Sequence, residues 1–236
     1  MYSLLINLER RKDRLEAAIN SAKKYSLDFE RLDAIDALNC NPGSENLVTL
    51  DVYACWQSHL KSYRTFLQTD YSYCLILEDD FTVKNRKSLR ILLEKRDWEN
   101  YDLLQVGFIL PGILNRITYI HSNCENLFFR IIGKFASAVK IHTITSKMRI
   151  NEALKSKKNI VANQFFPGTH AYIISRSMAQ KILSIKGPQM YSADLFYISL
   201  AQMRSFKIAR LRKSVFGQSN STPSISQRFL SKEDLI

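Results

Sequence analysis

The chain has 236 residues, of which 46% are hydrophobic and 11% aromatic, with only 7 Gly and 5 Pro. This composition excludes disordered, collagen-like and linker-dominated proteins, and the length suits one large domain with an ample core. The charge is uneven, because residues 1–100 hold 15 basic and 16 acidic side chains whereas residues 101–236 hold 19 basic and only 6 acidic ones.

Strands and helices are predicted to alternate through the first part of the chain. Apolar runs and helical spacing indicate strands over residues 2–8, 29–35, 73–77 and 101–106, and helices over residues 9–25, 52–67 and 87–98. The composition of residues 39–44 is typical of a loop. Such alternation favours an α/β fold with a mostly parallel sheet flanked by helices.

The pattern is looser beyond residue 107. We expect strands over residues 117–120, 127–132, 169–175 and 206–211, and helices over residues 146–158, 176–185 and 192–203. Residues 217–227 carry no charge and few apolar side chains, which predicts a mobile loop. No repeat or linker divides the chain, so we expect a single domain.

No segment predicts a membrane span or an export signal. No apolar run approaches the roughly 20 residues of a spanning helix, and residues 1–8 lack the basic start and the long apolar core of a signal peptide. The 4 cysteines form no C-x-x-C pair, so neither a zinc site nor a disulfide framework is indicated. We therefore expect a protein of the reducing cytoplasm.

Three carboxylates, Glu78, Asp79 and Asp80, directly follow the most apolar predicted strand. Ligands of open α/β sheets bind at the carboxyl ends of strands, and Mg²⁺ commonly takes only one or two protein carboxylates and completes its shell with water and phosphate oxygens. If the strand continues to Asp80, Glu78 and Asp80 share a face and form a site for Mg²⁺ or Mn²⁺. The alternative is that the three acids only end a strand. No glycine-rich phosphate-binding motif occurs.

Asn7, Arg10 and Arg14 follow the first predicted strand and reach the same edge if the strands are parallel. Arg10 and Arg14 are four residues apart and would share a helical face. An amide and two guanidinium groups could hold a uracil, ribose or phosphate group. Surface pairing with Glu9 and Asp13 is the alternative.

Two further side chains have both a structural and a functional interpretation. His59 lies on the apolar stripe of its predicted helix, so it is either a core histidine or a partner of the ligand and the carboxylates. Asp194 lies near a predicted helix start, where acids are common. It is also one of only 6 acids beyond residue 100, which makes it a candidate general base.

The order of these motifs resembles that of the family 25 glycosyltransferases, which include bacterial lipooligosaccharide galactosyltransferases. Residues 6–14 resemble the family's I-N-L-x-R-R-x-x-R start, residues 54–59 (ACWQSH) its small-Cys-x-x-Ser-His helix, and residues 75–80 (LILEDD) its acidic motif. Residues 168–176 (GTHAYIISR) are similar to its G-T-x-A-Y-x-I-S-R segment, and Asp194 stands where the family places an acid before a helix. Residues 107–164 match no motif, and we expect the acceptor to be chosen there.

The resemblance implies a single-domain, Rossmann-like GT-A fold, with a nucleotide-sugar and metal part over residues 1–106, an acceptor-side part over 107–216 and a mobile tail over 217–236. The implied reaction is inverting transfer of galactose from UDP-galactose, in β linkage, to a lipooligosaccharide or lipopolysaccharide acceptor. Taken with the residues above, the resemblance implies Asp80 and Glu78 as ligands of Mn²⁺ or Mg²⁺, Asp194 as the base, and a donor site formed by Asn7, Arg10, Arg14, His59, Glu78 and Asp79.

The basic excess leaves other classes of function open. A charge of +13 beyond residue 100 would suit nucleic acid, but no recognition motif or regular aromatic spacing accompanies it, so we expect no nucleic-acid partner. Paired acids also serve metal-dependent phosphotransferases and nucleases. We expect the basic part to face glycolipid and the anionic inner leaflet of a bacterial plasma membrane, which makes the protein cytoplasmic and peripheral. The sequence does not determine the oligomeric state.

Overall fold

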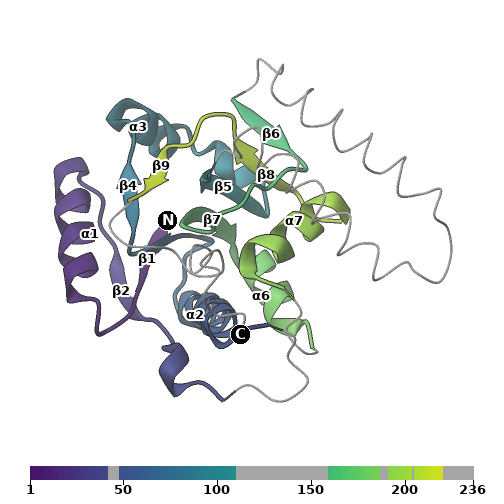
Figure 1. Cartoon of the computed structure of the whole chain (residues 1–236). Helices are drawn as coiled ribbons and strands as arrows, with labels where there is room; N and C mark the ends of the chain where they lie inside the picture. The colour runs from purple at the N-terminus through teal and green to yellow at the C-terminus, as the bar shows by residue number, and fades with distance from the viewer. Residues whose placement is uncertain (42–47, 110–158, 187–190, 204, 220–236) are drawn as a thin grey trace, which may run out of the picture.

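The computed structural model describes residues 1–41, 48–109, 159–186, 191–203 and 205–219. Within these ranges nine strands form one sheet, with the order β2-β1-β3-β7-β5-β8-β6 and with β9 pairing both β4 and β5 (Figure 1). The strands are β1 (Tyr2–Asn7), β2 (Glu30–Asp33), β3 (Tyr73–Glu78), β4 (Phe81–Val83), β5 (Leu103–Gly107), β6 (Ile160–Ala162), β7 (Ala171–Ser175), β8 (Ile208–Leu211) and β9 (Phe216–Gln218).

Helices cover both faces of this sheet. They are α1 (Lys12–Tyr25), α2 (Leu50–Leu67), α3 (Arg86–Lys95), α6 (Arg176–Ser184) and α7 (Ala193–Met203), with the short 3-10 helices η1 (Ala37–Asn39) and η2 (Asp97–Asn100). The core on one face includes side chains of α2, α6 and α7, and the core on the other face includes side chains of α1 and α3 (Figure 1). The predicted α/β fold is therefore confirmed.

Six of the nine described strands run in one direction, whereas β4, β6 and β7 run in the other. β1 is parallel to β2 and β3, and β5 is parallel to β8 and β9. β7 lies between β3 and β5 and is antiparallel to both, so that its first residue, Ala171, is opposite Leu77 and Gly107. The segment that precedes β7 therefore enters the sheet at the edge where β3 and β5 end.

The central strands β3 and β5 are buried on both faces, as predicted from the continuous apolar run of β3 and the mostly apolar sequence of β5. Four consecutive residues of β3, from Cys74 to Leu77, have no exposed surface, and the residues of β5 from Leu103 to Val106 are equally buried. Alternate side chains enter the two cores: Ile76 packs on the side of α2, whereas Leu75 and Leu77 pack on the side of α1. A strand covered by helices on both faces is rich in apolar side chains, and the polar exception in β5 is the buried Gln105.

The structure differs from the predictions at several short elements. β4, β6 and β9 have three residues each and were not predicted. Because β9 includes Gly217 and Gln218, the prediction of a mobile loop is wrong for its first two residues. α1 begins at Lys12 rather than at residue 9, because the chain makes a turn closed by a hydrogen bond of 2.8 Å from Arg11 N to Leu8 O. The elements predicted within 110–158 lie outside the described residues, as do residues 220–236.

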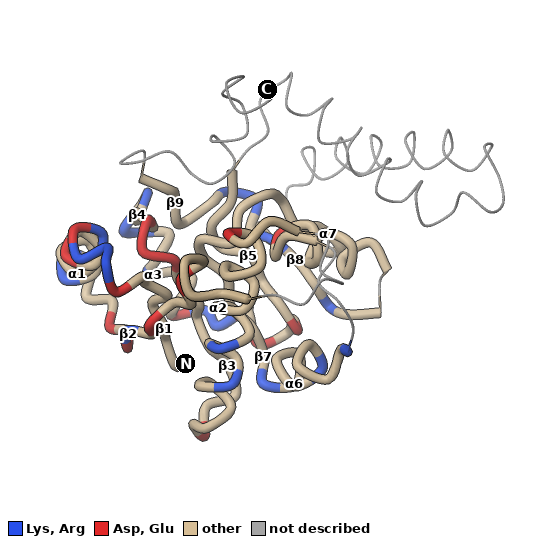
Figure 2. Tube along the Cα trace, turned by 60° about the horizontal axis from the view of Figure 1, so that its bottom comes forward, with Lys and Arg blue, Asp and Glu red and all other residues tan. Residues whose placement is uncertain are grey.

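Charged side chains of both signs are mixed over the described elements, as α1 illustrates (Figure 2). Of the 19 basic residues beyond residue 100, only 7 lie in the described ranges, at positions 176, 181, 186, 207, 210, 212 and 213. Most of the basic part therefore lies outside the described residues. Within those residues, no helix has the length and apolar character needed to cross a membrane.

Candidate active site

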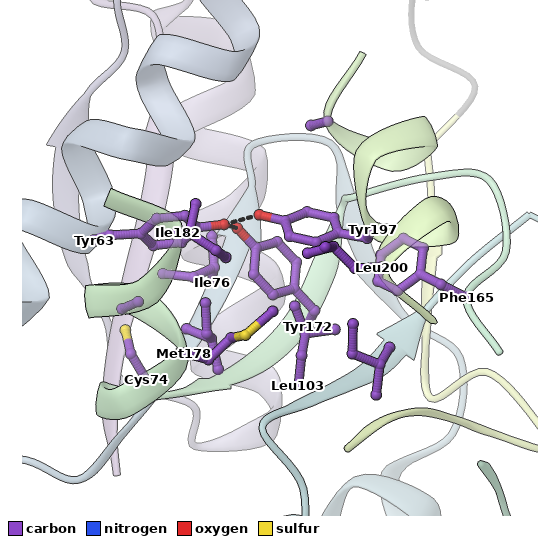
Figure 3. Close-up of a cluster of buried hydrophobic side chains, with 14 of the residues drawn as sticks. Tyr63, Cys74, Ile76, Leu103, Phe165, Tyr172, Met178, Ile182, Tyr197 and Leu200 are labelled. Atoms are coloured by element: carbon purple, nitrogen blue, oxygen red, sulfur yellow. Dashed lines mark hydrogen bonds between the residues drawn. The ribbon is translucent and has the colours of Figure 1, made fainter. Parts of the chain in front are cut away.

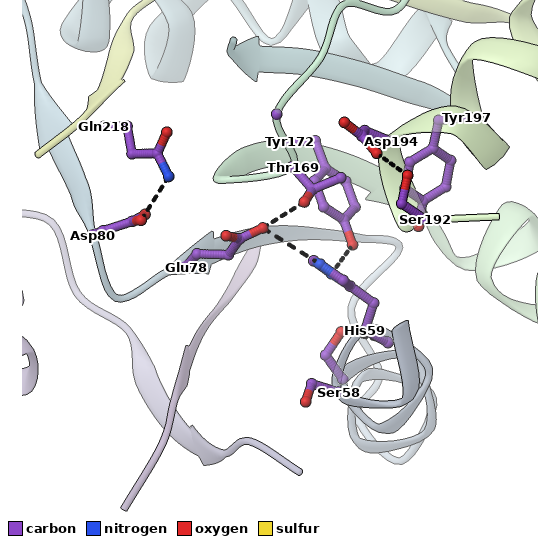
Figure 4. A network of polar contacts seen from close by, with 12 residues as sticks. Ser58, His59, Glu78, Asp80, Thr169, Tyr172, Ser192, Asp194, Tyr197 and Gln218 are labelled. Atoms are coloured by element: carbon purple, nitrogen blue, oxygen red, sulfur yellow. Dashed lines mark hydrogen bonds and ion pairs between the residues drawn. The ribbon is translucent and has the colours of Figure 1, made fainter. Parts of the chain in front are cut away.

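The acidic motif lies at the edge of the sheet where β1 and β3 end (Figure 4). β3 ends at Glu78, and Asp79 and Asp80 form the turn that leads into β4. The expectation that Glu78 and Asp80 share a strand face is therefore wrong, because the strand does not continue to Asp80. The three carboxylates instead have different partners.

Glu78 is held by two donors on one of its oxygens. Thr169 Oγ1 donates to Glu78 Oε1 at 2.5 Å, and His59 Nε2 lies 3.4 Å from the same oxygen (Figure 4). The Glu78 side chain is 24% exposed. Burial acts to raise the pKa of Glu78, but the contacts with His59 and Thr169 outweigh it and lower the pKa below its usual value. Glu78 is thus a fixed carboxylate that keeps its charge.

Asp80 is buried with an incomplete set of partners. Its Oδ2 accepts a hydrogen bond of 2.7 Å from Gln218 Nε2 and lies 3.9 Å from Arg14 Nη1. Its Oδ1 is buried and has no hydrogen-bond partner among the described residues. Burial and the negative charge of Glu78 raise the pKa of Asp80 to about 7. A buried carboxylate of this kind is suited to bind a cation.

The donor set suits a cation that shares its shell with substrate and water. In the part of the chain that the structure describes, no three His, Cys, Asp or Glu side chains form a ready metal cluster. Glu78 and Asp80 remain as two neighbouring carboxylates, which is the protein contribution that Mg²⁺ commonly uses when phosphate oxygens supply further ligands. The residues present therefore fit Mg²⁺ or Mn²⁺ at a diphosphate.

Asp79 joins the end of β3 to β1 and α1. Its Oδ2 accepts from Asn7 Nδ2 at 2.8 Å, and its Oδ1 accepts from Arg14 Nη1 at 2.9 Å. Asn7 Oδ1 in turn accepts from Arg31 Nε at 3.0 Å. Both Asp79 oxygens are engaged by the protein, so Asp79 holds the site together.

The side chains of Arg10 and Arg14 have different partners, Asp36 for Arg10 and Asp79 for Arg14. Arg10 Nε donates to Asp36 Oδ2 at 2.5 Å, because the turn after β1 places Arg10 before the start of α1. The prediction that Arg10 and Arg14 share a helical face is therefore wrong. Beside Arg10, at the ends of β1 and β2, lies a cavity of about 420 Å³ lined by Leu8, Glu9, Arg10, Lys12, Asp33, Ala34, Asp36 and Asn39.

Asp194 lies in the first turn of α7, as predicted. Its Oδ1 accepts hydrogen bonds from Ser192 Oγ and, at 2.9 Å, from Leu195 N (Figure 4). Burial, together with the negative charges of Glu78, Asp194 and Asp80, raises the pKa of the Cys55 thiol on α2. Tyr197, which lies on α7 with Asp194, is linked through Tyr63, Tyr172 and His59 to Glu78, so the structure brings Asp194 to the region of the acidic motif.

The family model of "Glycosyltransferase family 25 (LPS biosynthesis protein)" matches residues 1–197. The chain belongs to glycosyltransferase family 25. A glycosyltransferase 25 family member of Drosophila pseudoobscura pseudoobscura is 28% identical over 126 residues, which are 45% of this chain and 20% of that protein. The chain therefore matches about a fifth of the length of that relative.

Two solved structures align with most of this family 25 chain at low similarity. A STIV protein covers 92% of this chain and 83% of its own, with 12% identity and a TM-score of 0.43. A glycosyltransferase involved in the glycosylation of the major capsid of PBCV-1 covers 94% and 93%, with 11% identity and a TM-score of 0.33.

Several contacts in this family 25 site were not predicted from the sequence. Thr169 belongs to a family motif, but only the antiparallel β7 shows that it reaches Glu78. Its loop is held by the buried Gln105, whose Nε2 donates to Phe166 O and Gly168 O at 2.7 Å each. Nothing in the sequence indicates that Gln218 contacts Asp80, because the composition of residues 217–227 is typical of a loop. His59 is both a buried core residue and a partner of Glu78, so its two interpretations are compatible.

Proposed function

We propose that the protein is an inverting, metal-dependent glycosyltransferase that moves a hexose from a UDP-sugar to a saccharide hydroxyl. One observation carries this proposal: the buried Asp80, with an oxygen that lacks a described partner, lies beside the fixed carboxylate Glu78 at the carboxyl edge of the sheet. That edge is where α/β sheets bind ligands. Membership of family 25 supports glycosyl transfer as the reaction class.

The cavity at the ends of β1 and β2 suits the nucleoside of the donor. Its lining includes the carboxylates of Asp33 and Asp36, which can accept hydrogen bonds from a uracil N–H or from ribose hydroxyls. Arg10 lies in the same lining and adds donors for a carbonyl or a phosphate. A uridine in this cavity would have its diphosphate near Arg14 and the acidic motif, because β1 lies beside β3.

The carboxylates have two different roles in the proposed reaction: Asp80 and Glu78 would bind the cation, and Asp194 is the general base. When bound at Asp80 and Glu78, a divalent cation would stabilise the negative charge of the departing diphosphate. The acceptor oxygen forms its bond to C1 of the sugar while the bond from C1 to the UDP oxygen breaks, and Asp194 takes the hydroxyl proton. General-base assistance of this kind typically contributes on the order of 10²–10⁴-fold. Ser192 and the Leu195 N–H hold the Asp194 carboxylate in place.

Galactose is the sugar we propose, in β linkage, with a lipooligosaccharide or lipopolysaccharide saccharide as acceptor. The support is the resemblance to bacterial galactosyltransferases of family 25. A phosphate-bearing glycolipid acceptor also suits the basic part of the chain beyond residue 100. We place the protein at the cytoplasmic face of the plasma membrane, where basic residues near an anionic surface contribute about 1 kcal/mol each.

Release of UDP tests this function and separates it from its rivals. The protein is incubated with Mn²⁺ and UDP-galactose, UDP-glucose or UDP-N-acetylglucosamine, with and without a lipooligosaccharide acceptor. We expect fastest UDP release from UDP-galactose and a further increase with acceptor. No UDP release from any donor would contradict the proposal, and cleavage of a nucleic acid or release of inorganic phosphate would favour a nuclease or a phosphotransferase.

A further inference from the structure

The side chain of Arg210, on β8, is a buried cation for which the described residues provide no carboxylate. Arg210 is only 2% exposed. Its Nε donates to Gln164 Oε1 at 3.0 Å, and its Nη1 donates to the backbone oxygen of Leu211 at 2.9 Å. Both acceptors are neutral, and no ion pair among the described residues includes Arg210. Buried charges in proteins are normally paired, so this one needs an explanation.

The sequence around Arg210 explains why no carboxylate reaches it. Its hydrogen-bond partners, its ring contacts and its neighbouring strands β5 and β6 come from residues 103–109, 159–176 and 205–219. None of these three segments contains Asp or Glu. Burial lowers the pKa of Arg210 to about 10, and no carboxylate acts to raise it again. The guanidinium group is still charged at neutral pH, and its charge is not balanced.

Two aromatic rings hold this guanidinium group in place. Its Cζ lies 4.0 Å from the centre of the Phe166 ring and 5.3 Å from the centre of the Phe108 ring, and aromatic rings attract cations. Nη2 has no hydrogen-bond partner among the described residues and is not one of their fully buried unpartnered atoms, so it keeps some exposed surface. The group is therefore fixed with one free donor edge, which is how Arg commonly binds phosphate and carboxylate groups.

The guanidinium group lies at the same edge of the sheet as the acidic motif. β8 is parallel to β5, and Phe108 directly follows the end of β5. Phe166 belongs to the segment that leads into β7 at that edge. Because α/β sheets bind their ligands at the carboxyl ends of the strands, Arg210 is placed where it can meet a ligand.

Arg210 also lies on the face of the sheet that α7 covers. Ile208, two residues earlier in β8, packs in the core with α7, and side chains two apart in a strand share a face. In the loop before β7, Phe165 packs against Tyr197 of α7 with ring centroids 5.1 Å apart (Figure 3). A short connection joins the end of α7 to the start of β8, so the first turn of α7, with Asp194, lies toward the edge where β8 ends.

We propose that Arg210 binds an oxyanion, a phosphate or a carboxylate group, that belongs to the acceptor. The assignment to the acceptor rests on the proposed function, since it takes Asp194 as the base that faces the acceptor hydroxyl, whereas the oxyanion site itself does not. Phe108 and Gln164, which contact Arg210, lie at the two ends of residues 107–164, where we expect the acceptor to be chosen. A neutral acceptor would leave the buried charge unbalanced, so the site favours acidic saccharides.

The charge balance can be tested without any ligand, by urea unfolding of Arg210→Met and Arg176→Met in NaCl. Arg176 is the matched control, because each of its three guanidinium nitrogens donates to a backbone oxygen, of Leu67, Thr69 or Tyr71. We expect Arg176→Met to lower the urea midpoint. Arg210→Met should keep or raise it, since the variant removes a buried charge that has no opposite charge beside it. A midpoint that falls as far in Arg210→Met as in Arg176→Met would show a structural brace and overturn the inference.

Free anions test the oxyanion site directly. The urea midpoint of the whole protein is measured in sodium phosphate, sodium acetate and NaCl at neutral pH and equal ionic strength. Phosphate also stabilises proteins by its exclusion from their surface, so wild type is compared with Arg210→Met and with Arg212→Met, which removes an exposed charge nearby. We expect phosphate, acetate or both to raise the midpoints of wild type and Arg212→Met more than that of Arg210→Met. Equal shifts in all three proteins would overturn the inference.

Acceptor kinetics test whether the acceptor carries the oxyanion. The KM for a lipooligosaccharide acceptor is measured in wild type, Arg210→Gln and Arg212→Gln, and UDP affinity in Mn²⁺ is measured by calorimetry. We expect Arg210→Gln to raise the acceptor KM about 10- to 100-fold, with a much smaller rise in Arg212→Gln and with UDP affinity near that of wild type in both variants. An unchanged acceptor KM in Arg210→Gln would overturn the assignment to the acceptor.

These outcomes are distinct from a failure of the proposed function. Wild-type protein that transfers no sugar would contradict the proposed function, and the anion experiment would then decide the oxyanion site alone.

Discussion

Asn7 donates a hydrogen bond of 2.8 Å to Asp79, although 72 positions separate them in the sequence. The bond joins the end of β1 to the turn after β3. Arg14 of α1 engages the other oxygen of the same carboxylate at 2.9 Å. The first strand, the first helix and the acidic motif are thus tied together at one carboxylate, directly beside Asp80.

Asp79→Ala should destabilise the fold strongly. The side chains of Arg14 and Asp79 are only 18% and 9% exposed, and removal of one partner from a buried pair typically costs about 3–5 kcal/mol. Urea unfolding measures the loss. Glu94→Ala is the control, because its pair with Arg90 is exposed at 61% and 74% and should contribute about 0.3–0.5 kcal/mol. Equal losses in the two variants would contradict this role of Asp79.

Gly107→Ala should lower stability by about 1–3 kcal/mol through overpacking at the end of β5. An added Cβ would lie 2.8 Å from Ala171 Cβ and equally close to the His170 ring, both buried. Gly217→Ala is a matched control in β9, since its nearest contact, at 2.6 Å, is Cε of the flexible and exposed Lys84. A smaller loss for Gly107→Ala than for Gly217→Ala in urea unfolding would be contrary to this account.

Asp80→Asn should stabilise the cation-free protein at high pH. The pKa of Asp80 is raised from 3.8 to about 7, so between these values the folded state binds more protons than the unfolded state and loses stability as pH rises. Asn avoids this loss. In EDTA, the variant should exceed wild type by roughly 2–4 kcal/mol at pH 8 and match it near pH 4. A difference that is constant over this range would argue against the raised pKa.

The sequence predicts the parts of this fold that depend on local patterns. β3 is a continuous apolar run and β5 is mostly apolar, and helix spacing identifies α2, α6 and α7. β4 and β9 are too short to show a pattern, and they exist because Phe216 and Val83 pair across a long stretch of chain. Helical periodicity also does not reveal the turn after β1. The prediction therefore starts the first helix too early and puts Arg10 on the same helical face as Arg14.

The sequence predicts where the candidate site lies in the fold, but it does not predict most of the contacts between its side chains. Glu78 and Asp80 were found because acids after a buried strand lie at the ligand-binding edge. Thr169 and Gln218 reach those acids only because β7 and β9 enter the sheet at that edge. Such pairings are not local, so no spacing along the chain reports them. Asp194 was singled out by its charge in a basic region, and its role as a base stays a prediction.

Asp194→Asn tests that role. Because Asn cannot accept the proton of the acceptor hydroxyl, we expect kcat to fall on the order of 10²–10⁴-fold, with UDP affinity near that of wild type. Asn keeps the shape of the side chain and an oxygen for Ser192 and the Leu195 N–H, so the start of α7 should stay intact. UDP release and calorimetric UDP binding are both measured. A variant that turns over at the wild-type rate would end the assignment.

The central claim is that a divalent cation at Asp80 and Glu78 joins the protein to the diphosphate of the donor. Titration calorimetry of UDP, with Mn²⁺ and with EDTA, on wild type and on Asp80→Asn tests it most directly. We expect wild type to bind UDP at least about tenfold more tightly with Mn²⁺, a difference of about 1.4 kcal/mol, and the variant to lose this dependence. Equal UDP affinity in wild type with and without Mn²⁺, unchanged in the variant, would contradict the claim.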